Sequence, residues 1–272
     1  MTTSLDTEAQ SLVRRVFEKL RLHNPVLLGK GGEGLVYEYG ANVLKIFPQS
    51  PDLHYLQDLE LFQRGLANNH FTFLTPEILE VDSADGVTYT VEKRLRGVPM
   101  DKKLVDLGTA DRQKVFASYY QAIRQVHQIK YPDLPFGQII KTQESLSDTT
   151  WVGFLSALLD QKLRNTKTRM EHLVSDFDTK ITHFHELIES QLVSSDRNLV
   201  HRDYYHNNVL VGDNLEISAV LDFSAHAVVG DPRMDISSVL TWNEINPVVR
   251  PSDYDFLFQL TQQDYGDGIK QT

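Results

Sequence analysis

The most informative stretch of this chain runs from Leu199 to Asp222 and reads LVHRDYYHNNVLVGDNLEISAVLD. It contains two short apolar runs, Val209–Val211 and Ala219–Leu221, separated by a segment that begins with the turn-forming residues 212–214. Short apolar runs bounded by Gly, Asp and Asn are typical of buried strands joined by a turn. The pattern therefore predicts a hairpin of two buried strands with polar groups at both ends.

The polar groups at these ends have the residue types that phosphoryl transfer requires. That reaction needs an aspartate to orient the attacking hydroxyl and accept its proton, and an asparagine and an aspartate to hold magnesium against the nucleotide phosphates. The pattern His-x-Asp-x-x-x-x-Asn at 201–208, followed by Asp222 and Phe223, supplies all three groups. Each residue alone is more often an ordinary loop residue, but the ordered set indicates a kinase-type site.

Length and composition limit the fold class and the surroundings. A chain of 272 residues is long enough for two lobes. It has no cysteine, which fits a reducing compartment, and no apolar run approaches the roughly 20 residues of a membrane span. The net charge of −10 argues against a nucleic-acid surface and is compatible with a cationic substrate. We therefore expect a cytoplasmic protein, monomeric or weakly dimeric, that binds neither nucleic acid nor membranes.

A glycine loop near the N-terminus fits the same chemistry. Residues 29–36 read GKGGEGLV and match Gly-x-Gly-x-x-Gly-x-Val. A β-type run continues after the loop and another follows the turn at Gly40, so the glycines lie between strands rather than at the start of a helix. Such a loop turns its backbone N–H groups toward phosphates. The expected nucleotide-binding residues of the loop are Gly29, Gly31, Gly32, Gly34 and Val36.

Lys45 is a charged residue within the apolar strand predicted at 42–47. An unpaired ammonium is costly in such a strand, so the lysine needs an anion. In kinases the nucleotide phosphates and a glutamate of the next helix provide the negative charge. The helix predicted at 53–66 offers Glu60, with Asp58 as a competing candidate on a different face. The alternative is an edge-strand lysine that points to water.

The remaining pattern divides the chain near residue 97. The other elements expected in the first part are a helix at 12–20 and strands at 76–80 and 87–92. Together these segments give a five-stranded nucleotide-binding lobe over residues 1–97. We expect the backbone from Glu92 to Leu95 to line the adenine pocket as the hinge, by position rather than by residue type.

Residues 98–272 are expected to form a mainly helical catalytic and substrate-binding lobe. Apolar periodicity predicts one helix from about 111 to 127, two between 146 and 192, one that starts near 235 and one over 250–265, with a loop at 131–137. His127 is expected to be a packed core residue rather than a catalyst. Two apolar stripes are expected to enter the core; they consist of Trp151, Phe154, Leu155, Leu158 and Leu159, and of Leu173, Phe177, Ile181, Phe184 and Ile188.

These residues resemble those of the aminoglycoside phosphotransferase and choline kinase-like family, small-molecule kinases that share the bilobal protein-kinase fold. The resemblance spans about 27–238 and is strongest at 201–210, 221–223 and 230–235. It implies an α+β fold with a β-rich N-lobe that carries the glycine loop and a mainly helical C-lobe. The helical segment at about 138–197 would be the family's variable substrate-binding insertion.

The resemblance also implies an activity and residue roles. The enzyme would transfer the γ-phosphate of ATP to a hydroxyl with the help of Mg²⁺, and GTP is not excluded as the donor. Asp203 would be the catalytic base, and Asn208 and Asp222 would bind Mg²⁺. His201 and Asp235 would brace the catalytic loop. Lys45 together with Glu60 would position ATP.

Three features of the sequence depart from the family pattern. Arg202 stands where the family more often has glycine, and this departure resembles protein kinases. Ser224 follows Phe223 in place of the protein-kinase glycine. The segment after Asp235 looks short for the family, which usually adds further helices around the substrate pocket, so we expect an open or reduced site.

Two other functions are alternatives to a small-molecule kinase. A protein kinase is disfavoured because the segment between Asp222 and Asp235 is too short for an activation loop. A nucleotide-binding regulator without turnover is disfavoured because Lys45, Asp203 and Asn208 are all retained together with Asp222. We expect the acceptor to be a small hydroxylated molecule, such as an antibiotic or a metabolite. A polycation is less favoured, because acidic and basic residues interleave between 144 and 189 and can pair along exposed helix faces.

Overall fold

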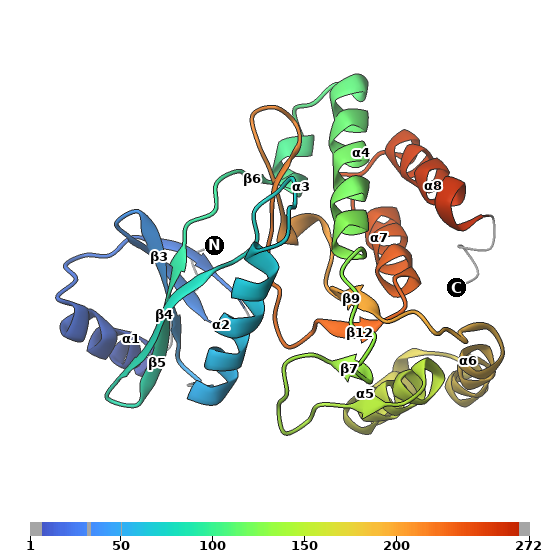
Figure 1. Cartoon of the computed structure of the whole chain (residues 1–272), viewed down its shortest axis with the longest axis horizontal. Helices are drawn as coiled ribbons and strands as arrows, with labels where there is room; N and C mark the ends of the chain where they lie inside the picture. Colours follow the sequence, from blue (N-terminus) through green and yellow to red (C-terminus); the bar gives the residue numbers. More distant parts are fainter. Residues whose placement is uncertain (1–6, 32–33, 50, 267–272) are drawn as a thin grey trace. The chain divides into compact units, whose positions relative to one another are not determined.

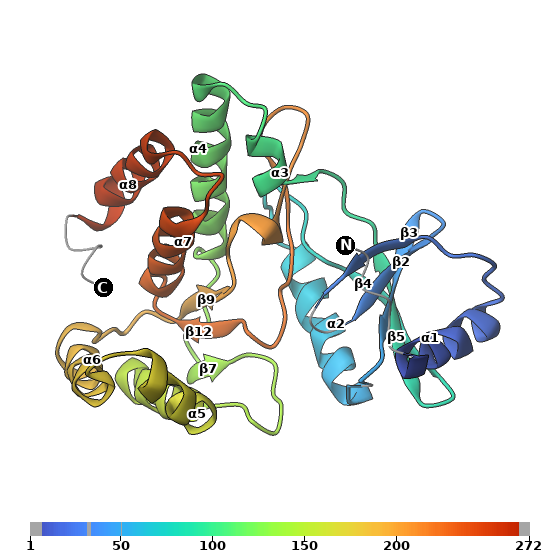
Figure 2. The ribbon, with the colours of Figure 1, turned by 180° about the vertical axis from the view of Figure 1, so that it is seen from behind.

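The chain folds as two units, Met1–Arg96 and Gly97–Thr272, and the computed structural model describes residues 7–31, 34–49 and 51–266. Figure 1 and Figure 2 show the elements of each unit from opposite sides. Within the described ranges, no helix combines the length and the apolar character that crossing a membrane requires.

The N-terminal unit is built on a five-stranded antiparallel sheet. Its elements are α1 (Thr7–Leu20), β1 (Leu27–Lys30), β2 (Leu35–Tyr39), β3 (Asn42–Phe47), α2 (Leu53–Ala67), β4 (Ile78–Ala84) and β5 (Val87–Lys93). The strand order is β1-β2-β3-β5-β4, which confirms the predicted five strands. β4 runs further than predicted, because Asp85 and Gly86 alone turn the chain, both with positive φ, as a two-residue hairpin loop requires.

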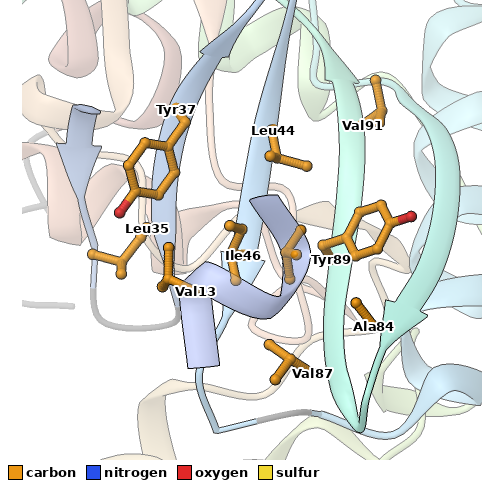
Figure 3. Packing of buried hydrophobic residues seen from close by; sticks show 10 residues of the cluster. Val13, Leu35, Tyr37, Leu44, Ile46, Ala84, Val87, Tyr89 and Val91 are labelled. Atoms are coloured by element: carbon orange, nitrogen blue, oxygen red, sulfur yellow. The ribbon is translucent and has the colours of Figure 1, made fainter. Parts of the chain in front are cut away.

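Helix α1 covers one face of this sheet. Val13 and Val16 of α1 are buried against side chains of β2, β3 and β5, as Figure 3 shows for Val13. Leu44 and Ile46 of β3 belong to this core. Because successive side chains of a strand point to opposite faces, Lys45 between them lies on the face away from α1.

The C-terminal unit combines helices with two small sheets. Its helices are α3 (Met100–Leu104), α4 (Thr109–Val126), α5 (Trp151–Leu173), α6 (Phe177–Gln191), α7 (Arg233–Ile245) and α8 (Pro251–Tyr265), with a short 3₁₀ turn, η1 (His206–Asn208). Its strands are β6 (Val98–Pro99), β7 (Phe136–Gln138), β8 (Ser147–Asp148), β9 (Asn198–Val200), β10 (Val209–Val211), β11 (Ile217–Val220) and β12 (Val228–Gly230). The strand orders are β11-β10-β6 and β8-β7-β12-β9.

The predicted hairpin is present as β10 and β11, which pair antiparallel. Both strands are mostly buried. The polar groups of the motif lie in the turn before β10 and at Asp222, which follows β11. Helix α4 packs against α8, and α7 packs against α8 (Figure 1). The hairpin also contacts α4 through β11.

Two predictions for the segment between α4 and β9 are wrong in part. The expected loop at 131–137 ends in β7, which pairs with β12. The second apolar stripe does not enter the core as a whole: Phe177 and Ile188 are buried, but Leu173 and Phe184 are exposed. Helix α6 packs mainly against α5, and a single partner helix covers only a narrow stripe of it.

Candidate active site

A tight turn between β9 and β10 holds Asp203 and Asn208 together. The Asn208 side chain donates from Nδ2 to Asp203 Oδ2 at 2.7 Å and to the Asp203 carbonyl at 2.9 Å. The backbone amide of Tyr205 donates to the Asp203 carbonyl, and the amide of Asn208 donates to the Tyr205 carbonyl. The carboxylate and the amide that the sequence places five residues apart therefore meet in one hydrogen-bonded turn.

Tyr204 fixes this turn to helix α4. Its hydroxyl donates to the Tyr119 carbonyl at 2.7 Å, and the Tyr119 hydroxyl donates to the Tyr204 carbonyl at 3.2 Å. The two rings stack with centroids 4.6 Å apart, and both side chains are fully buried. With Tyr204 anchored in the core, the backbone of the neighbouring, partly buried Asp203 is fixed to α4.

Asp235 of α7 binds the backbone just before Asp203. Its Oδ2 accepts the amide of His201 and its Oδ1 accepts the amide of Arg202, each at 2.7 Å. The Nε2 atom of His127 lies 3.0 Å from the same Oδ2. Burial by itself would raise the pKa of the Asp235 carboxyl, but the hydrogen bonds from His127 and the His201 amide outweigh it and hold this pKa below the ordinary value.

His201 links the two ends of the hairpin through its ring. Its Nδ1 accepts the Asp203 amide at 3.2 Å, so Nε2 carries the proton and donates to the Leu221 carbonyl at 2.8 Å. The ring also packs edge to face on Phe223 at 4.6 Å. Because both ring nitrogens are engaged, His201 orients Asp203 and the residues around Asp222 rather than transferring a proton itself.

Two non-glycine residues of the site adopt left-handed backbone conformations. Arg202 has φ 65° and Asp222 has φ 59°. This region costs an L-residue roughly 1–2 kcal/mol and favours glycine. The bond from the Arg202 amide to Asp235 holds that conformation in place. Such local strain is typical of residues whose backbone is fixed for function.

Electrostatics make Asp203 a stronger base than an ordinary aspartate. Burial raises the pKa of the Asp203 carboxyl, the hydrogen bond from Asn208 opposes that rise, and the negative charge of Asp222 adds to it. The two carboxylates therefore interact, although Asp222 follows Asp203 only after the whole β-hairpin. A carboxylate with a raised pKa accepts a proton more readily.

The donor atoms at this turn fit a magnesium ion. Asn208 uses Nδ2 to bond Asp203, so its Oδ1 is the atom left for a cation. The carboxylate of Asp222 acts electrostatically on Asp203 and is the second oxygen donor of the motif. Magnesium is usually held by one or two carboxylates, with water and phosphate oxygens completing its coordination. Across the described ranges, no three His, Cys, Asp or Glu side chains gather as a protein-only metal site. An all-oxygen pair of this kind fits a metal that arrives with a nucleotide.

The N-terminal unit carries the expected nucleotide-binding residues on its glycine loop. Gly29 lies within β1, and the Gly31 amide donates to the Gly34 carbonyl at 2.9 Å. A Cβ at Gly34 would lie 2.6 Å from the Ile46 carbonyl oxygen, so only glycine allows β2 to begin this close to β3. Gly32 lies outside the described residues.

Lys45 and Val36 share the sheet face that α1 leaves uncovered. They are direct partners across β2 and β3, and direct partners project to the same face. Thr90 of β5 is the partner of Lys45 on its other side, and its hydroxyl bonds Glu92 at 2.7 Å. Lys45 Nζ also lies 5.1 Å from the centroid of the Phe47 ring. The sheet thus places three of the expected residues, Val36, Lys45 and Glu92, on one face. Leu95 follows β5 in an irregular segment.

The two candidate partners of Lys45 differ in their surroundings. Glu60 is partly buried on α2 and forms an ion pair with Arg64 one turn further along the helix. Asp58 is exposed. Burial therefore favours Glu60 over Asp58 as the partner of Lys45. The ion pair between Glu60 and Arg64 was not expected from the sequence pattern.

Sequence reasoning missed several residues that position the site. Tyr119 anchors Tyr204, His127 binds Asp235, and the Asn207 side-chain amide lies 2.9 and 3.1 Å from the two carboxylate oxygens of Asp101. His127 was correctly expected to be buried, but its partner is more than 100 residues away in sequence. Nothing in local periodicity signals such a contact.

Several solved structures have a fold similar to that of this chain. The streptomycin–ATP–APH(2")-IIa ternary complex superposes with a TM-score of 0.65 at 16% identity, covering 99% of this chain and 88% of that chain. A putative fructosamine-3-kinase from Haemophilus somnus 129PT gives 0.63 at 15% identity, covering 95% and 83%. Macrolide 2'-phosphotransferase type I gives 0.55 at 16% identity, covering 97% and 85%. A comparison with curated protein sequences found no match.

These likenesses define the fold class as the α+β, kinase-like fold of the aminoglycoside phosphotransferases. The sequence profile of the Phosphotransferase enzyme family matches residues 27–265, and the chain belongs to that family. It is a small-molecule phosphotransferase that acts on hydroxyl groups. The family resemblance, the fold class and the enzyme class predicted from the sequence are thereby confirmed.

Proposed function

We propose that this phosphotransferase moves the γ-phosphoryl group of ATP to one hydroxyl of a small acceptor, with Asp203 as the base. The observation that carries the proposal is the hydrogen-bonded turn in which Asn208 binds Asp203 at Oδ2. That bond leaves Oδ1 of Asp203 to accept the proton of an incoming hydroxyl. The raised pKa of Asp203 supports the same role.

The nucleotide is assigned to the glycine loop and to residues on the face of the N-terminal sheet opposite α1. The backbone of the glycine loop, with Gly29, Gly31, Gly32 and Gly34, offers N–H groups to phosphates, and Val36 offers an apolar contact to the base. Lys45 supplies positive charge for the phosphates, and Glu60 orients it. The backbone from Glu92 to Leu95 is proposed to bind adenine. The donor is ATP in this proposal, and GTP remains an alternative because some structurally similar proteins are described as GDP complexes.

Asn208 and Asp222 are proposed to hold Mg²⁺. When bound, the ion neutralises negative charge on the phosphates. His201 and Asp235 keep the turn in position through the amides of residues 201–203. The lack of cysteine supports a cytoplasmic location as part of the same proposal.

The acceptor is proposed to be a hydroxylated antibiotic or metabolite. The structurally similar proteins are described with streptomycin, with kanamycin, as a fructosamine kinase and as a macrolide phosphotransferase. A protein kinase or a regulator without turnover receives less support, since the family consists of small-molecule phosphotransferases.

An ADP-release assay with a defined panel tests the proposal. The panel contains streptomycin, kanamycin, erythromycin, phenyl β-D-glucopyranoside and glycerol, each with Mg²⁺ and ATP. We expect at least one compound to raise ADP release above the acceptor-free rate, and we expect Asp203→Asn to remove that increase. An increase that persists in Asp203→Asn would contradict the assigned base.

A further inference from the structure

An aromatic pair stands beside the catalytic turn. The rings of Tyr205 and Trp242 have centroids 5.6 Å apart and are inclined by 39°. Trp242, on α7, is 41% exposed, and Ile245 three residues later on the same helix is 63% exposed. Together Trp242 and Ile245 expose apolar surface on α7 beside the turn that holds Asp203, and exposed apolar patches are candidate binding sites.

The turn that holds Asp203 also fixes Tyr205. Tyr204 is locked into the core against Tyr119, and backbone bonds join Tyr205 to Asp203 on one side and to Asn208 on the other. Tyr205 is therefore held in the same turn as Asp203 and Asn208. The aromatic pair is continuous with the catalytic centre.

We propose that Tyr205 and Trp242 form an acceptor subsite that binds the flat apolar face of a ring, such as the C–H face of a sugar, while a hydroxyl of that ring reaches Asp203. This inference rests on the proposed phosphotransfer and names the acceptor class. Aromatic side chains offer large, flat contact surfaces that bind ring faces by dispersion and area burial.

The charges around the pair favour a ring with few positive groups. Every additional buried ammonium would need an unpaired carboxylate. Close to Tyr205, Asp101 is bound by the Asn207 amide and Asp203 is bound by Asn208. Asp222 is the proposed magnesium ligand. A polycation would therefore find few free carboxylates at this turn.

Binding is tested by tryptophan fluorescence. The chain has two tryptophans, and Trp151 is buried, so quenching by an added compound reports mainly on Trp242. We expect saturable quenching by phenyl β-D-glucopyranoside or by erythromycin in the wild type, and none in Trp242→Phe. Glycerol, which has hydroxyls but no ring face, should not quench. Absence of saturable quenching by both ring compounds would overturn the inference.

Kinetics provide the second readout, with a matched control. Trp242→Ala should raise the KM for the ring acceptor by about 3- to 15-fold and change kcat by less than about twofold, because a stacking contact is lost and the base is untouched. Trp242→Phe should recover most of the affinity. Leu134→Ala truncates an apolar side chain that is also 41% exposed and lies outside the proposed substrate-binding segment, and it should change neither value. Equal KM values in the wild type and Trp242→Ala would overturn the subsite.

The outcomes separate the subsite from the reaction. Saturable quenching without ADP release from any panel compound would contradict the proposed function and leave the subsite standing. ADP release that is insensitive to Trp242→Ala would contradict the subsite and leave the function standing. If kanamycin were the best acceptor, with a KM that rises steeply with salt, a polycation site would replace the ring-face site.

Discussion

The Nε2 atom of His127 lies 3.0 Å from Oδ2 of Asp235, the same oxygen that accepts the His201 amide. One buried carboxylate thus joins the C-terminal end of α4 to the backbone that precedes Asp203. His127 does not contact the reacting groups, so its effect on the reaction passes through Asp235. It is a positioning residue.

His127→Ala should lower kcat by roughly 10- to 100-fold and leave the KM for ATP within about twofold, because a small displacement of the base costs rate rather than nucleotide affinity. His127→Gln keeps an N–H donor and should recover part of kcat. Steady-state kinetics measure both effects. The matched control is His70→Ala, which alters an exposed histidine that belongs to none of the proposed sites and should have no effect. If His127→Ala lowered kcat and ATP affinity to the same extent, and His127→Gln restored neither, His127 would have a merely structural role.

The buried ion pair between Arg112 and Asp253 should dominate the stability of the helical unit. Arg112 Nε donates to Asp253 Oδ2 at 2.9 Å, and both side chains are almost fully buried. Arg112→Met leaves a buried carboxylate without its partner and should lower the free energy of unfolding by about 3–5 kcal/mol. Lys167→Ala breaks an exposed pair with Glu171 and should cost less than about 1 kcal/mol.

Urea unfolding followed by tryptophan fluorescence measures this difference. Trp151 and Trp242 both lie in the C-terminal unit, so the signal reports on that unit alone. Similar midpoints for the Arg112 and Lys167 variants would contradict the assigned importance of the buried pair.

The protonation of Asp203 should depend on Asp222. In the enzyme without metal or nucleotide, the pKa of the Asp203 carboxyl should lie above the ordinary value of 3.8, because burial and the charge of Asp222 both disfavour the carboxylate. A raised pKa means that the base form is lost at a higher pH than for an ordinary aspartate. Asp222→Asn should lower the Asp203 pKa. Carbon-13 NMR titration of the carboxyl groups, with Asp203→Asn for assignment, measures this shift, and an Asp203 pKa below 3.8 would contradict the prediction.

Removal of the proposed metal ligand should affect nucleotide binding as well as turnover. Asp222→Ala loses a carboxylate that would reach the phosphates through Mg²⁺, so the enzyme should bind Mg·ATP more weakly. Calorimetry with and without Mg²⁺ separates the two contributions. In the wild type, Mg²⁺ should strengthen ATP binding, and in Asp222→Ala this gain should largely disappear. Unchanged Mg·ATP affinity would show that Asp222 does not hold the metal.

Local patterns predicted much of the fold but not the contacts that position the site. Alternating and helical periodicity identified the strands around Lys45 and the hairpin after Asp203, because burial of one face imposes a period on the sequence. The exposure of Leu173 and Phe184 was not predictable, since periodicity shows that a helix is amphipathic but not which neighbour covers it.

The bonds around Asp235 show the same limit within the site. Its position in the motif indicated a bracing role, yet its bond to His127 depends on how α4 and α7 pack in three dimensions. The left-handed backbone of Arg202 was also hidden, because arginine rarely adopts it and the stabilising carboxylate is distant in sequence. Tertiary contacts, rather than local preference, decide these features.

The most direct test of Asp203 as the catalytic base is a comparison of phosphoryl transfer and nucleotide binding in the same variant. Wild-type enzyme and Asp203→Asn are incubated with γ-³²P-labelled ATP, Mg²⁺ and the best acceptor of the panel, and label in the acceptor is counted while calorimetry reports Mg·ATP affinity. We predict labelled acceptor with the wild type, a rate at least about 100-fold lower with Asp203→Asn, and Mg·ATP affinity within about twofold in both. Equal transfer rates in the two enzymes would contradict the assignment of Asp203 as the base.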